Sequence, residues 1–333
     1  MERREFVKKA ALSGAALLGT RIPILRSSPA EAQADDVVPS MLSECLWGIH
    51  AEPGTKYNTP YKAITHAESL AGRRFAVDRQ YHPWDDSLPT GYEVWTRSLG
   101  RIPYVSWNSY TRGGGPVTWQ SIAAGSHDPW IIQQAQTIHA WGKRIYLAFN
   151  HEPENDSPRC GTAAEYRAAV AHIINVFNSH GATNVSWVVT LMSPTFQGHN
   201  GGARNWLPNA PYDIIGVDGY NRWPCYPKHG YKTFAEIFGP AHSFAVAIGK
   251  PMAICEFGTL EATACNNVNG DPNAKADWFK SGAHWIQTWA NVVFAAYSHV
   301  FATFRGKPMA FWFTSSSQSL TAFKQVGTSP YFS

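Results

Sequence analysis

Short apolar runs alternate with longer segments of helical period along most of the chain. The apolar runs, bounded by turn-forming residues, predict β-strands at 46–50, 74–79, 102–107, 144–149, 185–191, 213–220, 251–257 and 308–313. Amphipathic stretches between them predict helices, as over 128–142 and 162–181. The second of these starts at Thr162 with Glu165 three positions later, which is a capping box, and it stops at Gly181.

The order of these elements indicates the fold class. Eight predicted strands that alternate with helices are typical of an α/β protein with the (β/α)8 TIM barrel architecture. An open, doubly wound sheet is the competing architecture, but no G-x-G-x-x-G motif follows the first strand to favour it. No repeat, low-complexity tract or Pro/Ser-rich linker follows residue 40. We therefore expect a single domain over residues 35–333.

The first 34 residues have the composition of an export signal. Arg3 and Arg4 precede a modestly apolar stretch over 10–19, and the segment ends in Ala32-Gln33-Ala34, with small residues where a signal peptidase requires them. The apolar stretch is too short to span a bilayer. We predict a twin-arginine signal peptide over 1–34 and a mature protein that is secreted or periplasmic. A disordered basic N-terminus is the alternative.

Setting this segment aside changes the charge balance. The whole chain carries 28 Lys and Arg against 24 Asp and Glu, whereas residues 35–333 carry 22 against 21. The basic excess therefore belongs to the signal, and no nucleic-acid or anionic-membrane partner is implied. We expect a monomer that contacts neither nucleic acid nor membrane once the signal is removed.

The chain has five cysteines, Cys45, Cys160, Cys225, Cys255 and Cys265. Export into an oxidising space permits disulfides. Cys225 and Cys265 lie in loop-like sequence and are favoured as a pair, whereas Cys255 lies in an apolar strand and is expected to be a buried thiol. The odd number leaves at least one cysteine unpaired, and the connectivity stays open.

Polar and aromatic side chains follow most of the predicted strands. In a TIM barrel the C-terminal ends of the strands carry the functional groups. These positions hold His50, Asp78, Arg79, Trp107, Asn108, Asn150, His151, Glu152, Asp218, Tyr220, Glu256 and Trp312. Glu152 follows the fourth strand and Glu256 lies near the end of the seventh. Because these two strands face each other across an eight-stranded barrel, we expect both carboxyl groups in one site.

Two opposed carboxyl groups are what glycoside hydrolysis requires. One carboxylic acid protonates the leaving oxygen, and in retaining enzymes the other, about 5–5.5 Å away, attacks the anomeric carbon. Aromatic faces bind sugar rings, and the chain has 14 Trp. Each residue alone has a simpler explanation, since a strand-end Glu is usually solvated and Trp107 or Trp312 could fill the core. Their coincidence at strand ends favours a glycosidase site.

Other hydrolytic chemistries find less support. His151 and Glu152 begin an H-E-x-x-H zinc motif, but Asn155 stands where the second His is required, and Pro153 fits a strand exit better than a helix interior. No G-x-S-x-G nucleophile elbow occurs, and the 13 His residues show no ligand spacing. We expect no metal and no cofactor.

The segments FNHEPEND, GATNVSWVVTLMSP, YDIIGVDGYNRW, TFAEIFGP, GKPMAICEFGT and KADWF, in this order, resemble glycoside hydrolase family 26, the β-mannanase family of the retaining barrel clan. The resemblance covers residues 45–315. It implies that Glu152 is the acid/base, Glu256 the nucleophile, and Tyr220 a hydrogen-bond donor to the nucleophile. It also implies that Trp312, on the eighth strand, forms the floor of the site for the cleaved sugar. Trp107, Asn108, Asn150 and His151 are the other expected substrate contacts or supports.

The sequence departs from the family pattern near the expected substrate. Asn108 follows Trp107 where many members have His, and Pro153-Glu154 replaces Met-Asn after the His-Glu pair. Glu154 would add a charge that raises the pKa of Glu152. The resemblance therefore implies a secreted endo-β-1,4-mannanase that works by double displacement, with Glu152 of raised pKa and Glu256 ionised. A β-1,3-xylanase, a mixed-linkage β-glucanase and a non-catalytic polysaccharide-binding barrel are the alternatives.

Overall fold

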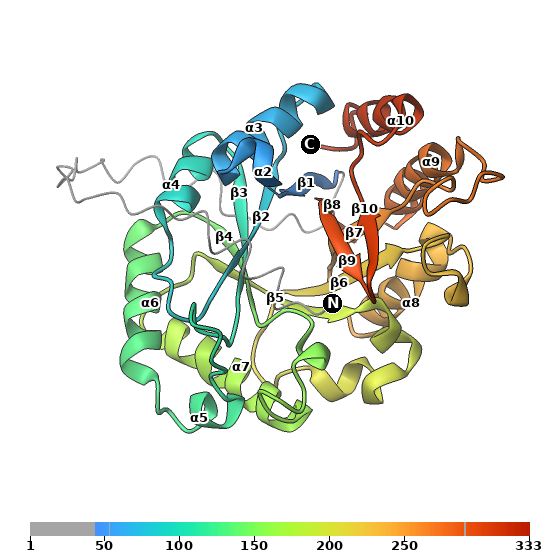
Figure 1. Ribbon diagram of the computed structural model, residues 1–333. Helices are drawn as coiled ribbons and strands as arrows, with labels where there is room; N and C mark the ends of the chain where they lie inside the picture. Colours follow the sequence, from blue (N-terminus) through green and yellow to red (C-terminus); the bar gives the residue numbers. More distant parts are fainter. Residues whose placement is uncertain (1–43, 53, 290) are drawn as a thin grey trace.

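A computed structural model describes residues 44–333 except 53 and 290, and it contains a closed parallel barrel with helices outside it (Figure 1). The barrel strands, each paired with the next and the last with the first, are β1 (Leu46–Ala51), β2 (Val77–His82), β3 (Ile102–Trp107), β4 (Ile145–Phe149), β5 (Val185–Met192), β6 (Ile214–Asn221), β7 (Met252–Thr259) and β8 (Val292–His299). The TIM barrel prediction is confirmed. The predicted signal peptide lies outside the described residues.

The α-helices surround the barrel between its strands. They are α2 (Gly54–Tyr57), α3 (Pro60–Ala71), α4 (Gly91–Ser98), α5 (Trp119–Ala123), α6 (Asp128–Trp141), α7 (Ala163–Ser179), α8 (Phe234–Ala247), α9 (Ala274–Thr288) and α10 (Ser317–Gly327). The predicted capping box begins α7, because Thr162 and Glu165 each accept a hydrogen bond from the other's backbone N–H. Across the described residues, no helix is both long and apolar enough to cross a bilayer.

The remaining connections contain short 3-10 turns. They are η1 (Pro153–Asn155), η2 (Ser193–Gln197), η3 (His199–Gly201), η4 (Ala203–Trp206) and η5 (Pro227–His229). The turns η2 to η4 form the connection between β5 and β6, where a helix would complete the regular alternation.

The eighth strand is the one that the sequence analysis placed wrongly. The prediction at 308–313 overlaps β10 (Lys307–Ala310), which pairs antiparallel with β9 (Phe301–Phe304) in a hairpin outside the barrel. The true eighth strand, β8, comes so soon after α9 that its apolar residues resemble a continuation of that helix. Another difference is that β2 begins three residues later than predicted.

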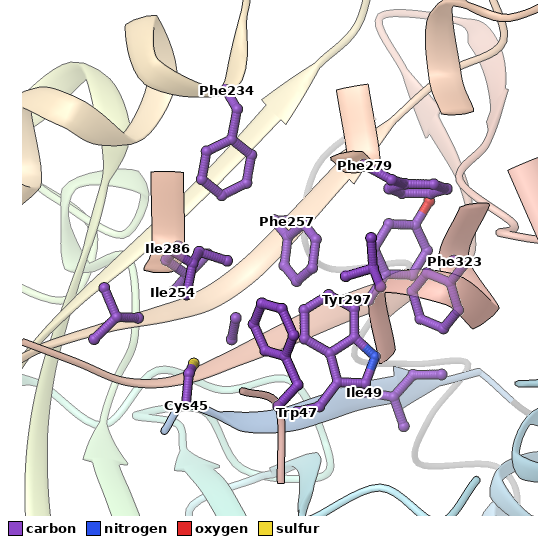
Figure 2. Close-up of a cluster of buried hydrophobic side chains, with 14 of the residues drawn as sticks. Cys45, Trp47, Ile49, Phe234, Ile254, Phe257, Phe279, Ile286, Tyr297 and Phe323 are labelled. Carbon is purple, nitrogen blue, oxygen red and sulfur yellow. The ribbon is translucent and has the colours of Figure 1, made fainter. Parts of the chain in front are cut away.

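Side chains alternate between the inside and the outside of the barrel, as strand geometry requires. The inner cluster includes Val77, Tyr104, Tyr146 and Phe294. A larger cluster lies between the sheet and the helices, and Figure 2 shows Phe257 and Tyr297 of this cluster beside Trp47. The inner and outer layers fill the barrel below its mouth, and the C-terminal ends of the strands are where a TIM barrel carries its functional site.

Loops and the hairpin β9–β10 cover the barrel mouth next to β6, β7 and β8. A disulfide joins Cys225, in the loop after β6, to Cys265, in the loop after β7, as the sequence analysis favoured. Cys225 also belongs to a small apolar cluster with Leu260, Met309 and Phe311. Cys255 is a buried thiol, as predicted, and Cys45 and Cys160 are buried thiols as well.

Candidate active site

A β-bulge in β7 turns Glu256 towards the barrel mouth. Ile254 pairs with Val217 of β6, but the next pair joins Glu256 to Asp218, so Cys255 is an extra residue. Ile254 packs outside the barrel and Cys255 inside it. Strict alternation would then point Glu256 outwards, but the bulge resets the pattern and brings its carboxylate inwards. Phe257 consequently packs in the outer core.

Three side chains from two other strands hold the Glu256 carboxylate. Tyr220 Oη donates a hydrogen bond to Oε2 at 2.6 Å, Tyr81 Oη donates to Oε1 at 2.6 Å, and Arg79 Nη2 donates to Oε1 at 2.9 Å. Burial raises the pKa of Glu256, but the Arg79 charge and these hydrogen bonds outweigh it and hold the pKa below its usual value. Glu256 is therefore an ionised carboxylate in fixed orientation.

Tyr81 is a site residue that the sequence analysis missed. The predicted strand ended at Arg79, whereas β2 continues to His82. With the correct bounds, alternation places Arg79 and Tyr81 on the inner face, while Asp78 faces outwards and accepts hydrogen bonds from Tyr92 and Thr96 of α4. The sequence signal that could have identified Tyr81 is the Arg-x-Tyr pattern, which lies near the end of a strand.

His151 and Asp218 complete the surroundings of Glu256. His151 Nε2 lies 3.4 Å from Glu256 Oε1, and Asp218 Oδ2 lies 3.8 Å from Arg79 Nη2. Burial raises the pKa of Asp218 well above its usual range, and the charges of Glu256 and Glu152 raise it further. Asp218 therefore keeps its proton while Glu256 is ionised, which is how neighbouring carboxyl groups take different roles.

His151, Asp218 and Glu256 also have the donor atoms that a metal ion needs, all within 4.8 Å of one another. The Arg79 guanidinium, however, already contacts Glu256 and lies beside Asp218. A fixed positive charge at this position opposes the binding of a second cation. The residues do not fit a metal site.

Glu152 lies in a strained turn immediately after β4. Asn150 and Glu152 both have left-handed backbones, with φ of 46° and 49°. Such conformations cost about 1–3 kcal/mol each and persist only where the surroundings enforce them. Asn150 supplies part of that enforcement, because its Oδ1 accepts hydrogen bonds from Ser109 N and Oγ and its Nδ2 donates to Asp156.

The Glu152 carboxylate interacts electrostatically with Asp218 and Arg222, as Glu256 does. Asn155 Nδ2 donates a hydrogen bond to its Oε2 at 2.8 Å. Burial lowers the pKa of Arg222, and the nearby Tyr220, Glu152 and Glu256 oppose that shift. The charges of Glu152 and Glu256 both act on Asp218 and on Arg222, so the two carboxyl groups lie on the same side of the barrel, at its mouth.

The expected influence of Glu154 on Glu152 is corrected by the structure. Glu154 is buried, and its Oε1 accepts hydrogen bonds from Met192 N at 3.0 Å and Thr195 Oγ1 at 2.6 Å. Burial raises the pKa of Glu154 to about 8, and the charge of Glu152 contributes to the rise. Near neutral pH this carboxyl group is protonated, so it adds no negative charge beside Glu152. It ties the turn after β4 to the loop after β5.

Three of the expected substrate contacts or supports are buried side chains. Trp107 lies on the outer face of β3, fully buried, where it stacks on Trp84 with ring centroids 4.4 Å apart. Alternation along β3 explains the error, because Val105 and Trp107 share the outer face. Asn108 and Asn150 are also buried, at 1% and 0% exposure, so neither reaches a sugar directly. Asn150 is a structural support.

Trp312 lies beside the end of β8 although it does not belong to that strand. Phe311 N donates a hydrogen bond to Val300 O at 2.9 Å, and Phe313 N donates to His299 Nδ1 at 3.3 Å. These two contacts hold the segment of Trp312 against the strand end, and its side chain is 41% exposed. The prediction of its strand was wrong, but the indole is available at the mouth.

Comparisons with known proteins agree with this architecture. No family model matches the sequence. The chain is 29% identical to endoglucanase H of Acetivibrio thermocellus over 250 residues, which is 70% of this chain and 26% of that protein. The modular endo-β-1,4-mannanase of Cellulomonas fimi, a family 26 glycoside hydrolase, has a TM-score of 0.59 at 14% identity, covering 87% of this chain and 72% of that one.

A third match is the β-mannanase from a symbiotic protist of the termite Reticulitermes speratus, solved in complex with gluco-manno-oligosaccharide. It has a TM-score of 0.54 at 15% identity and covers 87% of this chain and 88% of that one. The chain spans about a quarter of the length of the endoglucanase that it matches in sequence. The resemblance to glycoside hydrolase family 26 is thus confirmed at the level of the fold, and in sequence the chain is similar to an endoglucanase.

Proposed function

We propose that the protein is a retaining glycoside hydrolase that cleaves β-linked polysaccharide. The observation that carries the proposal is the state of Glu256, a buried carboxylate kept ionised by Arg79 and oriented by Tyr81 and Tyr220. An ionised carboxylate at a barrel mouth, with a second carboxyl group in the turn after β4, is the arrangement that we propose for double displacement. The named activities of the similar proteins support the same class of reaction.

In the proposed mechanism Glu256 attacks the anomeric carbon while Glu152 protonates the departing oxygen. A covalent glycosyl-enzyme forms, and the leaving sugar departs with its proton. Glu152 then removes a proton from water, which attacks the same carbon and releases Glu256. Tyr220 holds one oxygen of Glu256 while Tyr81 and Arg79 hold the other, so the carboxylate meets the sugar in a fixed orientation. Glu152 must hold its proton at the working pH for the first step.

The polysaccharide that we propose first is β-1,4-linked mannan, because mannanases have the same fold. A mixed-linkage β-glucan is the second candidate, favoured by the endoglucanase whose sequence is more similar than those of the mannanases. A panel of mannan, galactomannan, glucomannan, lichenan and β-1,3-xylan, with product analysis, separates these substrates. Glucomannan cleavage without lichenan cleavage supports the mannanase, and the reverse supports the glucanase.

The assignment of Glu152 is tested with Glu152→Ala and two kinds of substrate. We expect hydrolysis of the polysaccharide to fall by about 10²–10⁴-fold, because the leaving sugar then lacks its acid. A dinitrophenyl glycoside, whose leaving group needs no proton, should still react with Glu256. Glu154→Gln, two positions away, is the matched control and should cleave the polysaccharide normally. Normal polysaccharide hydrolysis by Glu152→Ala would show that Glu152 is not the acid.

A barrel that binds polysaccharide without cleaving it is the competing function. Reducing-end release from the panel, abolished in Glu256→Ala, separates catalysis from binding. We also propose export by the twin-arginine route, supported by Arg3-Arg4 and by a disulfide of the kind that oxidising compartments favour. Replacement of Arg3 and Arg4 by Lys should leave the protein in the cytoplasmic fraction.

A further inference from the structure

The hairpin β9–β10 presents one face to the protein and the other to solvent. Ala302 and Phe304 of β9 and Met309 of β10 pack against the apolar cluster over β6 to β8. Because side chains alternate along a strand, Phe301 lies on the opposite face. Its side chain is 42% exposed, and it adjoins Trp312, which is 41% exposed. The ring centroids are 5.8 Å apart, and the ring planes differ by 32°.

This aromatic pair is joined to the nucleophile through a short series of contacts. Tyr220 donates to Glu256, lies 2.9 Å from Ser298 Oγ near the end of β8, and packs against Phe311 with ring centroids 4.9 Å apart. Phe311 immediately precedes Trp312 in the chain. The pair of Phe301 and Trp312 therefore lies on the β8 side of the mouth, and Phe311 and Tyr220 connect it to the carboxylate that would attack the sugar.

Hydrogen bonds hold the backbone of both Phe301 and Trp312 in place. Trp312 O accepts a hydrogen bond at 2.7 Å from Lys275 Nζ, whose side chain is buried in α9. Phe301 N donates to Glu52 Oε2, beyond the end of β1, at 3.1 Å. Arg222 stacks on Phe304 with its guanidinium 4.7 Å from the ring centroid, which fixes the packed face of the hairpin. The backbone segments that carry the two exposed rings are thus fixed on the protein, and a binding segment that is ordered before the ligand arrives lowers the cost of binding.

We infer that Phe301 binds the sugar unit next to the one that Trp312 holds, so that the hairpin β9–β10 forms an extended subsite for a β-linked glycan chain. This inference rests on the proposed function. Two partly exposed aromatic rings leave apolar area in water at a free-energy cost, and the C–H face of a hexose can cover that area. The chemistry favours a neutral sugar, because the exposed groups at this position are apolar rings.

The test measures binding in the Glu256→Ala background, in which hydrolysis does not consume the ligand. Calorimetric titration with soluble glucomannan and with lichenan gives the parent affinity. Adding Phe301→Ala should weaken binding of the preferred polysaccharide by about tenfold, whereas Phe301→Tyr should restore it. Val246→Ala shortens another exposed apolar side chain, which is 57% exposed but lies on the outer helix α8, and this change should leave the affinity unchanged.

The active protein provides a second measurement. Phe301→Ala should raise KM for the polysaccharide by a similar factor, and it should leave hydrolysis of a dinitrophenyl monosaccharide glycoside within twofold, because this substrate cannot reach the subsite. Unchanged polysaccharide affinity in Phe301→Ala, with a parent that binds, would overturn the subsite and leave the proposed function intact. A parent protein that neither binds nor cleaves any polysaccharide of the panel would overturn both the subsite and the proposed function.

Discussion

At the scale of single residues, the Arg79 charge and the hydrogen bonds from Tyr220, Tyr81 and Arg79 together lower the pKa of Glu256 and keep it ionised. Tyr220→Phe removes the donor to one carboxylate oxygen and should lower kcat by about 10- to 100-fold, since a hydrogen bond to a charged group contributes about 1.5–3 kcal/mol. The same loss raises the pKa of Glu256, so the acidic limb of kcat/KM should move to higher pH. The pH profile of the variant checks both effects.

The control for this variant is Tyr166→Phe, which deletes a buried hydroxyl that donates to the backbone oxygen of Phe149. It should lower Tm without moving the acidic limb. An unmoved limb in Tyr220→Phe would contradict the account of how Glu256 stays ionised.

Glu154 gives a pH dependence of stability whose sign follows from its burial. Its folded pKa of about 8 lies above the unfolded value of about 4.3, so the native state binds more protons between these pH values. Stability then falls as pH rises through this range. Glu154→Gln removes the titration while keeping an acceptor for Met192 and Thr195. Its Tm relative to the parent should rise by several degrees between pH 5 and pH 8, measured by calorimetry.

A Tm difference that stays constant from pH 5 to pH 8 would show that Glu154 is ionised in the folded protein. In that case Glu154 would act on Glu152 as the sequence analysis expected.

Glu256 and its partner Tyr220 could be placed at the barrel mouth from sequence because each stands in a motif at a strand end. Tyr81 could not, because its strand was ended too early, and a shift of a few residues hides which side chains face inwards. Trp107 was misassigned although the bounds of β3 were predicted correctly, because it shares the outer face of that strand with Val105. The sequence shows which residue types lie near a strand end, but which of them face into the barrel depends on the register of the strand.

At the scale of elements, the disulfide joins the two loops that support the hairpin β9–β10. It links positions 40 residues apart, and such a crosslink stabilises a protein by about 2–4 kcal/mol. The double variant Cys225→Ser/Cys265→Ser should therefore lose several degrees of Tm in calorimetry. Dithiothreitol should lower the Tm of the parent but not that of the variant. Equal sensitivity of both proteins would exclude this disulfide as the cause.

The hairpin also explains why the eighth strand was misplaced. Two apolar segments compete for the last barrel position, and the one that follows the helix α9 so closely shows no turn signal at its start. The choice between them depends on which segment can pair with both β7 and β1, and β8 does so. Pairing over such distances leaves no local trace in the sequence.

At the scale of the whole molecule, the alternation of apolar runs with helical segments was sufficient to predict the barrel. Its closure brings β4 and β7 to opposite sides of the mouth, and this alone unites groups from residues about a hundred positions apart. The bulge at Cys255, which aims Glu256, arises from the fit of β7 against β6 and was not predictable from alternation. The sequence therefore indicated the location of the site better than its geometry.

The central claim is that Glu256 forms a covalent bond to the sugar. Incubation with a dinitrophenyl 2-deoxy-2-fluoro-β-glycoside of the preferred sugar slows release of the intermediate, because fluorine destabilises the oxocarbenium-like transition state. Mass spectrometry of the digested protein should then find one fluoroglycosyl group on the peptide that contains Glu256. A protein that cleaves its polysaccharide but acquires no label, or acquires it on another residue, would contradict this account.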